Sequence, residues 1–146
     1  MGTRASRGSL PTCWFTECME PVPSPDPASA PDPLAVLTMA VRSFAEEREW
    51  QPFHTPKNLA MALAGEVGEL LAELQWLTPE QSAAVMADEL AGARIRAEIG
   101  DVTIYLVRLA EVLGIDLVDA AMEKLADSAR RYPVGRSRGS AAKAPQ

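Results

Sequence analysis

The sequence predicts an all-α protein, a helical bundle of about four to five helices. Between residues 34 and 132, apolar residues recur at steps of three and four, which places them on one face of a helix. No stretch alternates apolar and polar residues over the length that a strand needs. Prolines and glycines stand where one periodic segment stops and the next begins, as expected for loops between helices.

The first two predicted helices begin at matching signals. The first covers about residues 34–50 and follows Asp32-Pro33, and the second covers about residues 56–76 and follows Thr55-Pro56. In each pair, a side chain able to accept a hydrogen bond from free N–H groups precedes a proline suited to the first turn. Residues 51–56 between the two helices contain two prolines and are predicted to form a loop.

Three further helices complete the prediction. Thr78 caps a short helix that continues to about residue 90, where Ala91-Gly92-Ala93 predicts a break. A long helix over about residues 94–113 ends at Gly114. Asp116 then caps a last helix that reaches Tyr132-Pro133.

The two ends of the chain differ from its middle. Six of the thirteen residues from Pro21 to Pro33 are proline, so residues 1–33 are predicted to be a disordered, proline-rich leader. Residues 135–146 contain Gly, Ser, Arg, Lys and Ala and are predicted to be a flexible basic tail. One domain, residues 34–134, remains between them.

The composition limits the class of partner. The 146 residues carry a formal net charge of −6, which argues against binding a nucleic-acid polymer or an anionic membrane. No apolar run approaches the roughly 18 residues of a membrane span, and the start lacks the apolar segment of a signal peptide. Cys13 and Cys18 form no zinc motif. We therefore expect a cytoplasmic protein with reduced thiols.

Acidic residues border the apolar face of the helix predicted over residues 56–76. At 100° per residue, its apolar stripe is roughly 120° wide. Glu66, Glu73 and Glu69 lie about 20°, 40° and 80° outside this stripe, all on one side. A solvent-facing acid would lie opposite it. The stripe consists of Leu59, Leu63, Val67, Leu70, Leu71 and Leu74.

The helix predicted over residues 94–113 repeats this arrangement. Glu98 lies about 20° and Asp101 about 80° outside its apolar stripe, on one side, with Tyr105 beside Glu98. That stripe consists of Ile95, Ile99, Val102, Leu106, Leu109 and Leu113. If the two long helices pack antiparallel with these sides facing, four carboxylates converge.

Converging carboxylates predict a divalent cation. Like charges at close range destabilise a fold, and a hard ion such as Mg²⁺, which takes oxygen ligands and usually arrives with a substrate phosphate, removes that cost. Gly68 and Gly100 lie inside the two acid pairs, where a helix glycine costs about 1 kcal/mol relative to alanine. Close backbone approach or space for a ligand would explain them. The alternative is a helix pair with ordinary charged edges.

Seven stretches then carry a resemblance to a known family. They are Phe44-Ala45-Glu46-Glu47-Arg48-Glu49-Trp50, Phe53-His54-Thr55-Pro56-Lys57-Asn58-Leu59, Gly65-Glu66-Val67-Gly68-Glu69-Leu70, Gln75-Trp76, Glu98-Ile99-Gly100-Asp101-Val102, Ile104-Tyr105-Leu106-Val107 and Arg131-Tyr132-Pro133-Val134. In this order, over about Leu34 to Val134, they resemble the all-α NTP pyrophosphohydrolases, the MazG-like proteins. The branch they look most like is that of the dCTP pyrophosphatases.

The resemblance implies a function and a metal site. It implies a helical protomer that assembles as a dimer or a dimer of dimers. It implies Mg²⁺-dependent cleavage of a nucleoside triphosphate, with a pyrimidine such as dCTP favoured, to the monophosphate and pyrophosphate, clearing unwanted nucleotides from the pool. The metal-binding and catalytic acids of the family fall on Glu66, Glu69, Glu98 and Asp101.

The resemblance also implies a substrate pocket. Trp50, Trp76 and His54 would hold the base, and Tyr105 would line the same pocket. Lys57 and Tyr132 would contact phosphate. The family commonly has Asn four residues before the Tyr of Tyr-Pro, and Ser128 stands there, with a hydroxyl but without the reach of an amide.

The residues themselves leave alternatives open. The tryptophans end their predicted helices, where an indole can stack on a base at about 1–3 kcal/mol, but tryptophans also occupy cores and interfaces. His54 is the only histidine and can serve as a hydrogen-bonding loop residue. Lys57 is unfavourable near a helix N-terminus unless an anion is near. The rival functions are a noncatalytic helical interaction or regulatory module and a phosphatase that releases inorganic phosphate.

Overall fold

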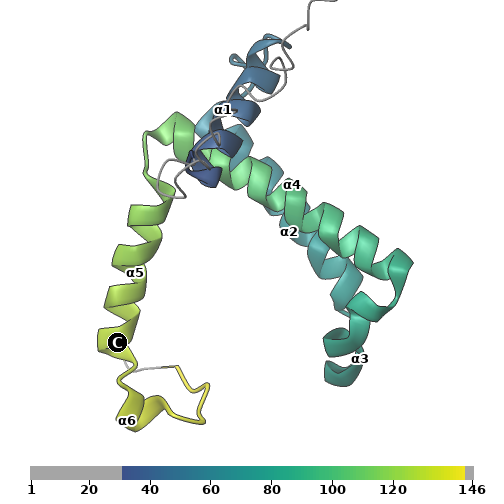
Figure 1. Cartoon of the computed structure of the whole chain (residues 1–146), viewed down its shortest axis with the longest axis vertical. Helices are drawn as coiled ribbons and strands as arrows, with labels where there is room; N and C mark the ends of the chain where they lie inside the picture. Colours follow the sequence, from purple (N-terminus) through teal and green to yellow (C-terminus); the bar gives the residue numbers. More distant parts are fainter. Residues whose placement is uncertain (1–30, 144–146) are drawn as a thin grey trace, which may run out of the picture. The chain divides into compact units, whose positions relative to one another are not determined.

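Every regular element of the described chain is helical. The computed structural model describes residues 31–143, and these form, in order, α1 (Pro33–Glu46), α2 (Pro56–Leu74), α3 (Pro79–Ala84), the 3₁₀ turn η2 (Val85–Ala87), α4 (Glu89–Leu113), α5 (Leu117–Arg131) and α6 (Val134–Ser137) (Figure 1). The all-α prediction is confirmed. Residues 1–30 of the predicted leader, with Cys13 and Cys18, lie outside the described residues, as do residues 144–146 of the tail.

The predicted capping residues begin their helices. Asp32 accepts a hydrogen bond from the backbone N–H of Leu34, and Thr55 accepts one from that of Asn58. Thr78 forms a capping box: its hydroxyl accepts from the backbone N–H of Gln81, and the side chain of Gln81 accepts from that of Thr78. Each cap satisfies N–H groups that a helix leaves free at its start.

The break predicted at residues 91–93 is wrong. α3 ends at Ala84, η2 follows, and Asp88 caps α4 by accepting from the backbone N–H of Ala91. α4 then runs through Gly92 without interruption. Gly92 is buried against Met86, whose backbone Cα and O would lie 3.5 and 3.6 Å from an added Cβ. Those distances are ordinary van der Waals contacts, so a methyl group would also fit between α4 and the preceding turn.

Two other boundaries differ from the prediction. α1 ends at Glu46 rather than near Trp50, because the chain turns at Glu49, which has a φ of 53°. α2 ends at Leu74, so Trp76 lies in the following turn. After α5, a single helical turn, α6, occupies the first residues of the predicted tail.

α1 and α2 pack against α4. α2 and α4 lie side by side and antiparallel (Figure 1), and α1 packs against α4 as well. The buried apolar residues come from these three helices: Ala45, Leu59, Ile95, Val107 and Ala110. α5 makes no comparable contact with another helix.

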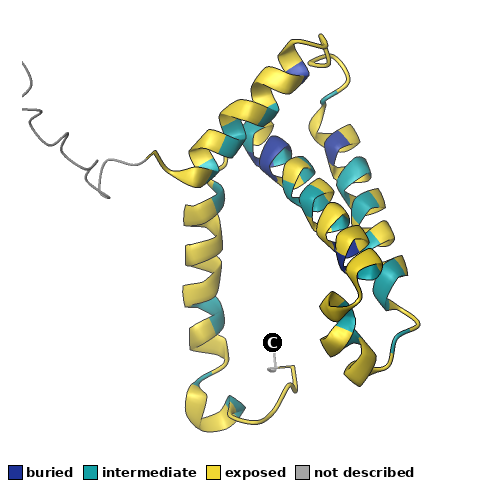
Figure 2. Ribbon diagram, turned by 45° about the vertical axis from the view of Figure 1, so that its right-hand side comes forward, coloured by how far each residue is buried: buried dark blue, intermediate teal, exposed yellow. Residues whose placement is uncertain are grey.

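The predicted buried stripes are only partly buried. Leu59 and Ile95 are covered, but the other stripe residues of α2 and α4 are half-buried or exposed (Figure 2). The exposed ones are Val67, Leu71, Ile99, Leu106 and Leu113. One chain covers only one side of each helix, because the amphipathic helix α5 does not pack on the pair. No helix among residues 31–143 combines the length and the apolar character needed to cross a membrane.

Gly114 provides a test of the connection between α4 and α5. It ends α4 in the left-handed region, at a φ of 67°. We expect Gly114→Ala to lower the free energy of unfolding by about 1–2 kcal/mol, because a side chain strains this backbone conformation. Gly65 lies inside α2 with open space around an added Cβ. Gly65→Ala is the control, expected to raise the free energy of unfolding by up to about 1 kcal/mol. Urea denaturation measures both, and equal effects would contradict this explanation.

Candidate metal and nucleotide site

Three of the predicted acids converge between α2 and α4. Glu66, Glu69 and Glu98 each offer a carboxylate oxygen, and these oxygens all lie within 4.8 Å of one another. The acid-bearing sides of the two helices therefore face each other, an arrangement that helical spacing left open. Further along the same seam, Glu73 of α2 pairs with Arg94 of α4 at 2.8 Å. The antiparallel register therefore places the cluster beside a neutralised ion pair.

Asp101 stands at the edge of this cluster. It is exposed and is not in the set of oxygens within 4.8 Å. Its charge still raises the pKa of Glu66 and of Glu98. Of the four predicted metal-binding acids, the fold thus brings three into direct proximity and the fourth within electrostatic range.

Ionisation of the clustered acids is unfavourable. Loss of solvent raises the pKa of Glu98, and the charges of Glu69, Asp101, Glu66 and Glu73 raise it further. Loss of solvent likewise raises the pKa of Glu66, followed by the charges of Glu69 and Asp101. Oxygen Oε2 of Glu98 is buried and has no hydrogen-bond partner. An ionised oxygen without a partner is unfavourable in a protein interior.

These features fit a hard divalent cation. The donor atoms of the cluster are all carboxylate oxygens, the ligand type that Mg²⁺ prefers. A cation would give Oε2 of Glu98 a partner and would reverse the repulsion among the acids. Glu66, Glu69 and Glu98 could hold such an ion, with Asp101 adjacent.

The two glycines inside the acid pairs face open space. A Cβ added at Gly68 or at Gly100 would meet no atom of the described chain within 4 Å. Close backbone approach between α2 and α4, one explanation offered by the sequence, is therefore wrong within a single chain. Space beside the acids is the explanation that remains.

Phe44 of α1 and Trp50 and His54 of the segment before α2 form a cluster of rings, the aromatic corner. The rings of Trp50 and His54 meet edge to face with centroids 5.8 Å apart, and Phe44 meets Trp50 in the same way at 5.7 Å. Trp50 remains 41% exposed. Its indole is thus held in place by two neighbours while part of it stays open, an arrangement suited to stacking against a planar ligand.

The other predicted pocket residues are dispersed. Trp76 follows α2 and is 86% exposed, and Lys57 lies exposed in the first turn of α2. Tyr105 is half-buried on α4. Ser128 on α5 and Tyr132 at its end lie on a part of the chain that packs on neither α2 nor α4. One chain alone does not gather these side chains around the acids.

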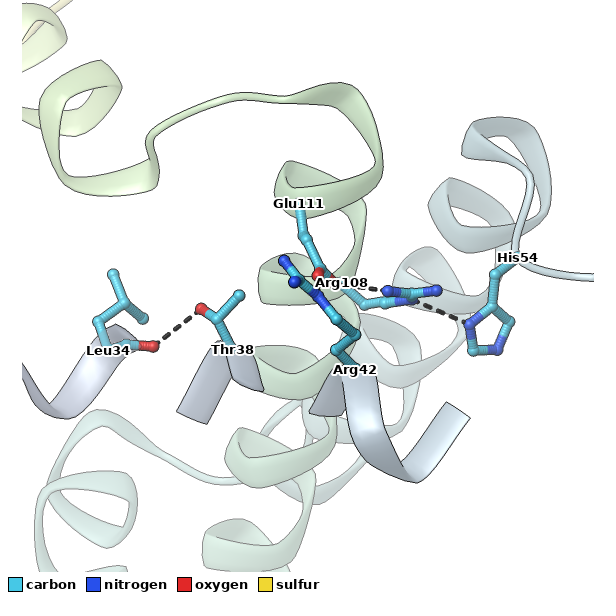
Figure 3. Close-up of polar contacts among 6 residues, drawn as sticks. All are labelled: Leu34, Thr38, Arg42, His54, Arg108 and Glu111. Atoms are coloured by element: carbon cyan, nitrogen blue, oxygen red, sulfur yellow. Dashed lines mark hydrogen bonds and ion pairs between the residues drawn. The ribbon is translucent and has the colours of Figure 1, made fainter. Parts of the chain in front are cut away.

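Sequence reasoning missed a second polar cluster. Arg108, in the middle of an apolar run of α4, is only 7% exposed. It donates hydrogen bonds to Nδ1 of His54, at 3.2 Å, and to Glu111, which also accepts from Arg42 of α1 (Figure 3). The available signal was an arginine and a glutamate three residues apart within an otherwise apolar stretch.

The fold and the acid cluster define a class of protein, an all-helical one with a carboxylate-lined candidate metal centre between two antiparallel helices. Residues 54–135 match the family described as MazG nucleotide pyrophosphohydrolase domain. The match spans more than half of the chain and contains all four acids, so this chain belongs to the MazG nucleotide pyrophosphohydrolase family.

Individual relatives agree with the family. The chain is 45% identical over 100 residues to dCTP pyrophosphatase 1 of Bos taurus and 42% identical to that of Homo sapiens. Each alignment covers 68% of this chain and 59% of the relative, so the chain spans under two thirds of the length of these relatives. The fold is similar to that of a pyrophosphatase from Archaeoglobus fulgidus DSM 4304, with a TM-score of 0.64 and 36% identity over 68% of this chain and 92% of that one.

The raised pKa values predict a pH dependence of stability. A carboxyl whose pKa is raised in the folded state binds protons more tightly there than in the unfolded chain. The stability contributed by Glu66 and Glu98 is therefore present below the ordinary pKa of 4.5 and is lost as pH rises through their raised values. In EDTA, we expect the free energy of unfolding to fall over this range. Glu98→Gln should flatten the fall, and Mg²⁺ should reverse it in the unaltered protein.

Urea denaturation at a series of pH values checks this expectation. Glu47→Gln is the control, because Glu47 is exposed and its side chain contacts only Ser43 and Arg48, which are also exposed. If neither Glu98→Gln nor Glu47→Gln changes how the free energy of unfolding depends on pH, the acid cluster is not the origin of this dependence.

Proposed function

We propose that this protein is a Mg²⁺-dependent nucleoside triphosphate pyrophosphohydrolase. Its reaction is the hydrolysis of a deoxynucleoside triphosphate to the monophosphate and pyrophosphate, with dCTP or a similar pyrimidine nucleotide preferred. Such an activity would remove unwanted nucleotides from the cytoplasmic pool. The dCTP pyrophosphatase 1 relatives and the MazG family match support this substrate class.

One observation carries the proposal. Three carboxylates from two helices crowd together with a buried, unpartnered oxygen among them. An exposed charged edge, the alternative reading of the sequence, would leave each acid solvated and at its ordinary pKa. Instead, loss of solvent and like charges raise the pKa of Glu66 and of Glu98. Such crowded carboxylates are typical of sites where a bound cation, and the substrate it carries, offsets their repulsion.

The residues of the chain divide the chemical work. Glu66, Glu69, Glu98 and Asp101 would hold the cation. When bound, Mg²⁺ would neutralise phosphate oxygens and lower the pKa of a coordinated water. A carboxylate of the cluster would orient the attacking water and accept its proton. Because α2 and α4 are packed helices, the acids are held in position before the substrate arrives, which favours catalysis by positioning and charge compensation.

The aromatic corner would hold the base. Trp50 presents its partly exposed indole and is supported by Phe44 and His54. Stacking of a base on such a ring contributes about 1–3 kcal/mol. Trp76 and Tyr105 are proposed to complete the base pocket, and Lys57, Ser128 and Tyr132 to contact the sugar and phosphates.

The assembled site is proposed to need a second copy of the chain, in a dimer or a dimer of dimers. α5 is amphipathic, and its apolar side, which includes Val118, Met122 and Leu125, is exposed. The uncovered apolar residues of α2 and α4 add to this area. Contiguous exposed apolar surface of this kind marks an interface. Association would also allow Ser128 and Tyr132 of one chain to lie near the acid cluster of another.

The noncatalytic alternative shares the fold and the interface. A regulatory module would keep exposed apolar helices for a partner but would have no need for crowded, partly desolvated acids. The phosphatase alternative would use the same metal site and differs in its product, inorganic phosphate. Both are separated from the proposal by direct product analysis.

Activity measurements test the function. With Mg²⁺ and a panel of deoxynucleoside triphosphates, we expect release of pyrophosphate and the monophosphate, fastest with dCTP. Glu69→Gln should lower kcat at least about 100-fold, because it removes a charge that holds the cation and the transition state. EDTA should abolish turnover. Glu47→Gln, which alters an exposed acid away from the cluster, should retain full activity. Absence of metal-dependent turnover with every nucleotide would overturn the enzyme proposal, and release of inorganic phosphate would favour the phosphatase.

The oligomer has its own test. Leu125 lies on the apolar side of α5 and is 62% exposed, and the exposed Ala126 lies beside Glu123, Asp127 and Arg130. We expect Leu125→Asp to reduce the molar mass measured by light scattering to that of a single chain, because a buried unpaired charge opposes association. Activity should fall with it. Ala126→Asp introduces the same charge one residue away and should preserve both mass and activity. A wild-type protein that is monomeric and active would contradict the proposed assembly.

A further inference from the structure

The second polar cluster links three parts of the chain. Arg108 of α4 donates to His54 in the loop before α2, while Glu111 accepts hydrogen bonds from both Arg108 and Arg42 of α1 (Figure 3). Arg108 is the charged residue that the described core encloses most fully, at 7% exposure. A buried guanidinium requires partners for its charge and its donors. Glu111 supplies the charge, which leaves the contact with His54 to be explained.

Glu111 is suited to anchor the arginine. Burial alone would raise its pKa, but hydrogen bonds from Arg42 and Arg108, together with their charges, lower it below its ordinary value. Glu111 is therefore ionised at neutral pH and holds both guanidinium groups. The result is a fixed arginine, rather than a flexible one, behind the histidine ring.

The contact determines which nitrogen of His54 carries hydrogen. An arginine side chain has only donors and stays protonated. Nδ1 of His54, 3.2 Å from Nε of Arg108, must therefore be an acceptor without hydrogen. The neutral ring then has its hydrogen on Nε2. Desolvation and the positive charge of Arg108 both lower the pKa of His54, consistent with a neutral ring.

The ring that Arg108 orients belongs to the aromatic corner. His54 packs edge to face against Trp50, the residue proposed to stack on the base. His54 itself is only half-buried. Its remaining polar atom, the Nε2–H group, is one donor at a defined place beside Trp50. A donor of this kind selects ligands that present an acceptor there.

We propose that Arg108, anchored by Glu111 and Arg42, is a positioning residue that holds His54 as a neutral ring with hydrogen on Nε2, so that His54 donates this hydrogen to an acceptor atom of the nucleotide. This inference rests on the proposed function, because the ligand of the aromatic corner is taken to be the substrate. The acceptor is an oxygen or nitrogen of the base, or an oxygen of the phosphates.

Nitrogen NMR on the unaltered full-length chain gives the first test. His54 is the only histidine, so its ring signals need no assignment. At pH 7, we expect a neutral ring with hydrogen on Nε2 and none on Nδ1. Hydrogen on Nδ1, or a doubly protonated ring, would overturn the proposal. This measurement needs neither a variant nor enzymatic turnover.

A titration then identifies the acceptor. A nonhydrolysable dCTP analogue with Mg²⁺ should shift the Nε2–H signal of His54. A shift that inorganic tripolyphosphate reproduces assigns the acceptor to the phosphates, and one seen only with the analogue assigns it to the nucleoside part. If the analogue binds without moving this signal, the proposal is overturned.

Kinetics separate positioning from folding. We expect Arg108→Met to raise KM for dCTP about tenfold and to leave kcat within about twofold, because it weakens one hydrogen bond remote from the acids. His54→Gln should have a similar effect. The double variant should be no worse than either single one, since Arg108 acts through His54. Additive losses, or a normal KM in folded Arg108→Met, would overturn the proposal.

Two further variants serve as controls. Arg96→Met alters an exposed arginine of the same helix and should leave KM and the histidine signals unchanged. Arg108→Gln with Glu111→Gln removes both buried charges together, and serves if Arg108→Met fails to fold. It should show the same raised KM and a mixture of the two neutral ring forms. If no nucleotide is turned over at all, the proposed function fails, whereas the histidine measurements still decide this inference.

Discussion

The antiparallel packing of α2 against α4 is the constraint on which the candidate site depends. Leu59 of α2 and Ile95 of α4 are buried, and the register of the helix pair places Glu66 and Glu69 close to Glu98. Apolar burial favours the contact, while the like charges and the unpartnered oxygen of Glu98 oppose it. The fold therefore keeps an unfavourable group of charges in place through packing elsewhere in the same helix pair. Stored cost of this kind is typical of functional sites.

α4 carries two charge clusters with opposite character. In the first half of α4, Glu98 has a raised pKa because it loses solvent and lies among other acids. Near its end, Glu111 has a lowered pKa because Arg42 and Arg108 outweigh its burial. The two positions are about 20 Å apart along the helix, at 1.5 Å per residue. The negative charge of Glu111 is thus balanced by two arginines of the same chain, whereas Glu98 has only other acids around it. Only the cluster around Glu98 would gain from an external cation.

A single chain leaves apolar faces of its helices exposed. Its buried apolar residues come only from α1, α2 and α4, whereas the apolar side of α5 remains open within the described residues. The pocket residues predicted from the family resemblance are correspondingly spread over α2, α4, α5 and the connecting segments. This distribution is understandable if the nucleotide site is formed where chains meet, because residues on α5 would then approach the acids of another copy.

Much of the architecture followed from local chemistry in the sequence. The predicted caps at Asp32, Thr55, Thr78 and Asp116 were confirmed, as was the glycine end of α4, because these signals act within a few residues. Helical spacing alone also placed Glu66 and Glu69 on one flank of their helix and Glu98 and Asp101 on one flank of theirs. The break predicted at Gly92 was wrong, because Asp88 caps α4 before this glycine and the helix continues through it.

The sequence by itself determined the helices, the acids and the family resemblance, because each of these rests on residue type and spacing. Only the tertiary structure decided that the acid-bearing sides of α2 and α4 meet, that the apolar stripes stay partly uncovered, and that Arg108 lies behind His54. The physical reason is that these features depend on the register between segments far apart in the chain. Residues 54 and 108, or 69 and 98, acquire their environment only when the helices pack, and no periodicity within one helix encodes that contact.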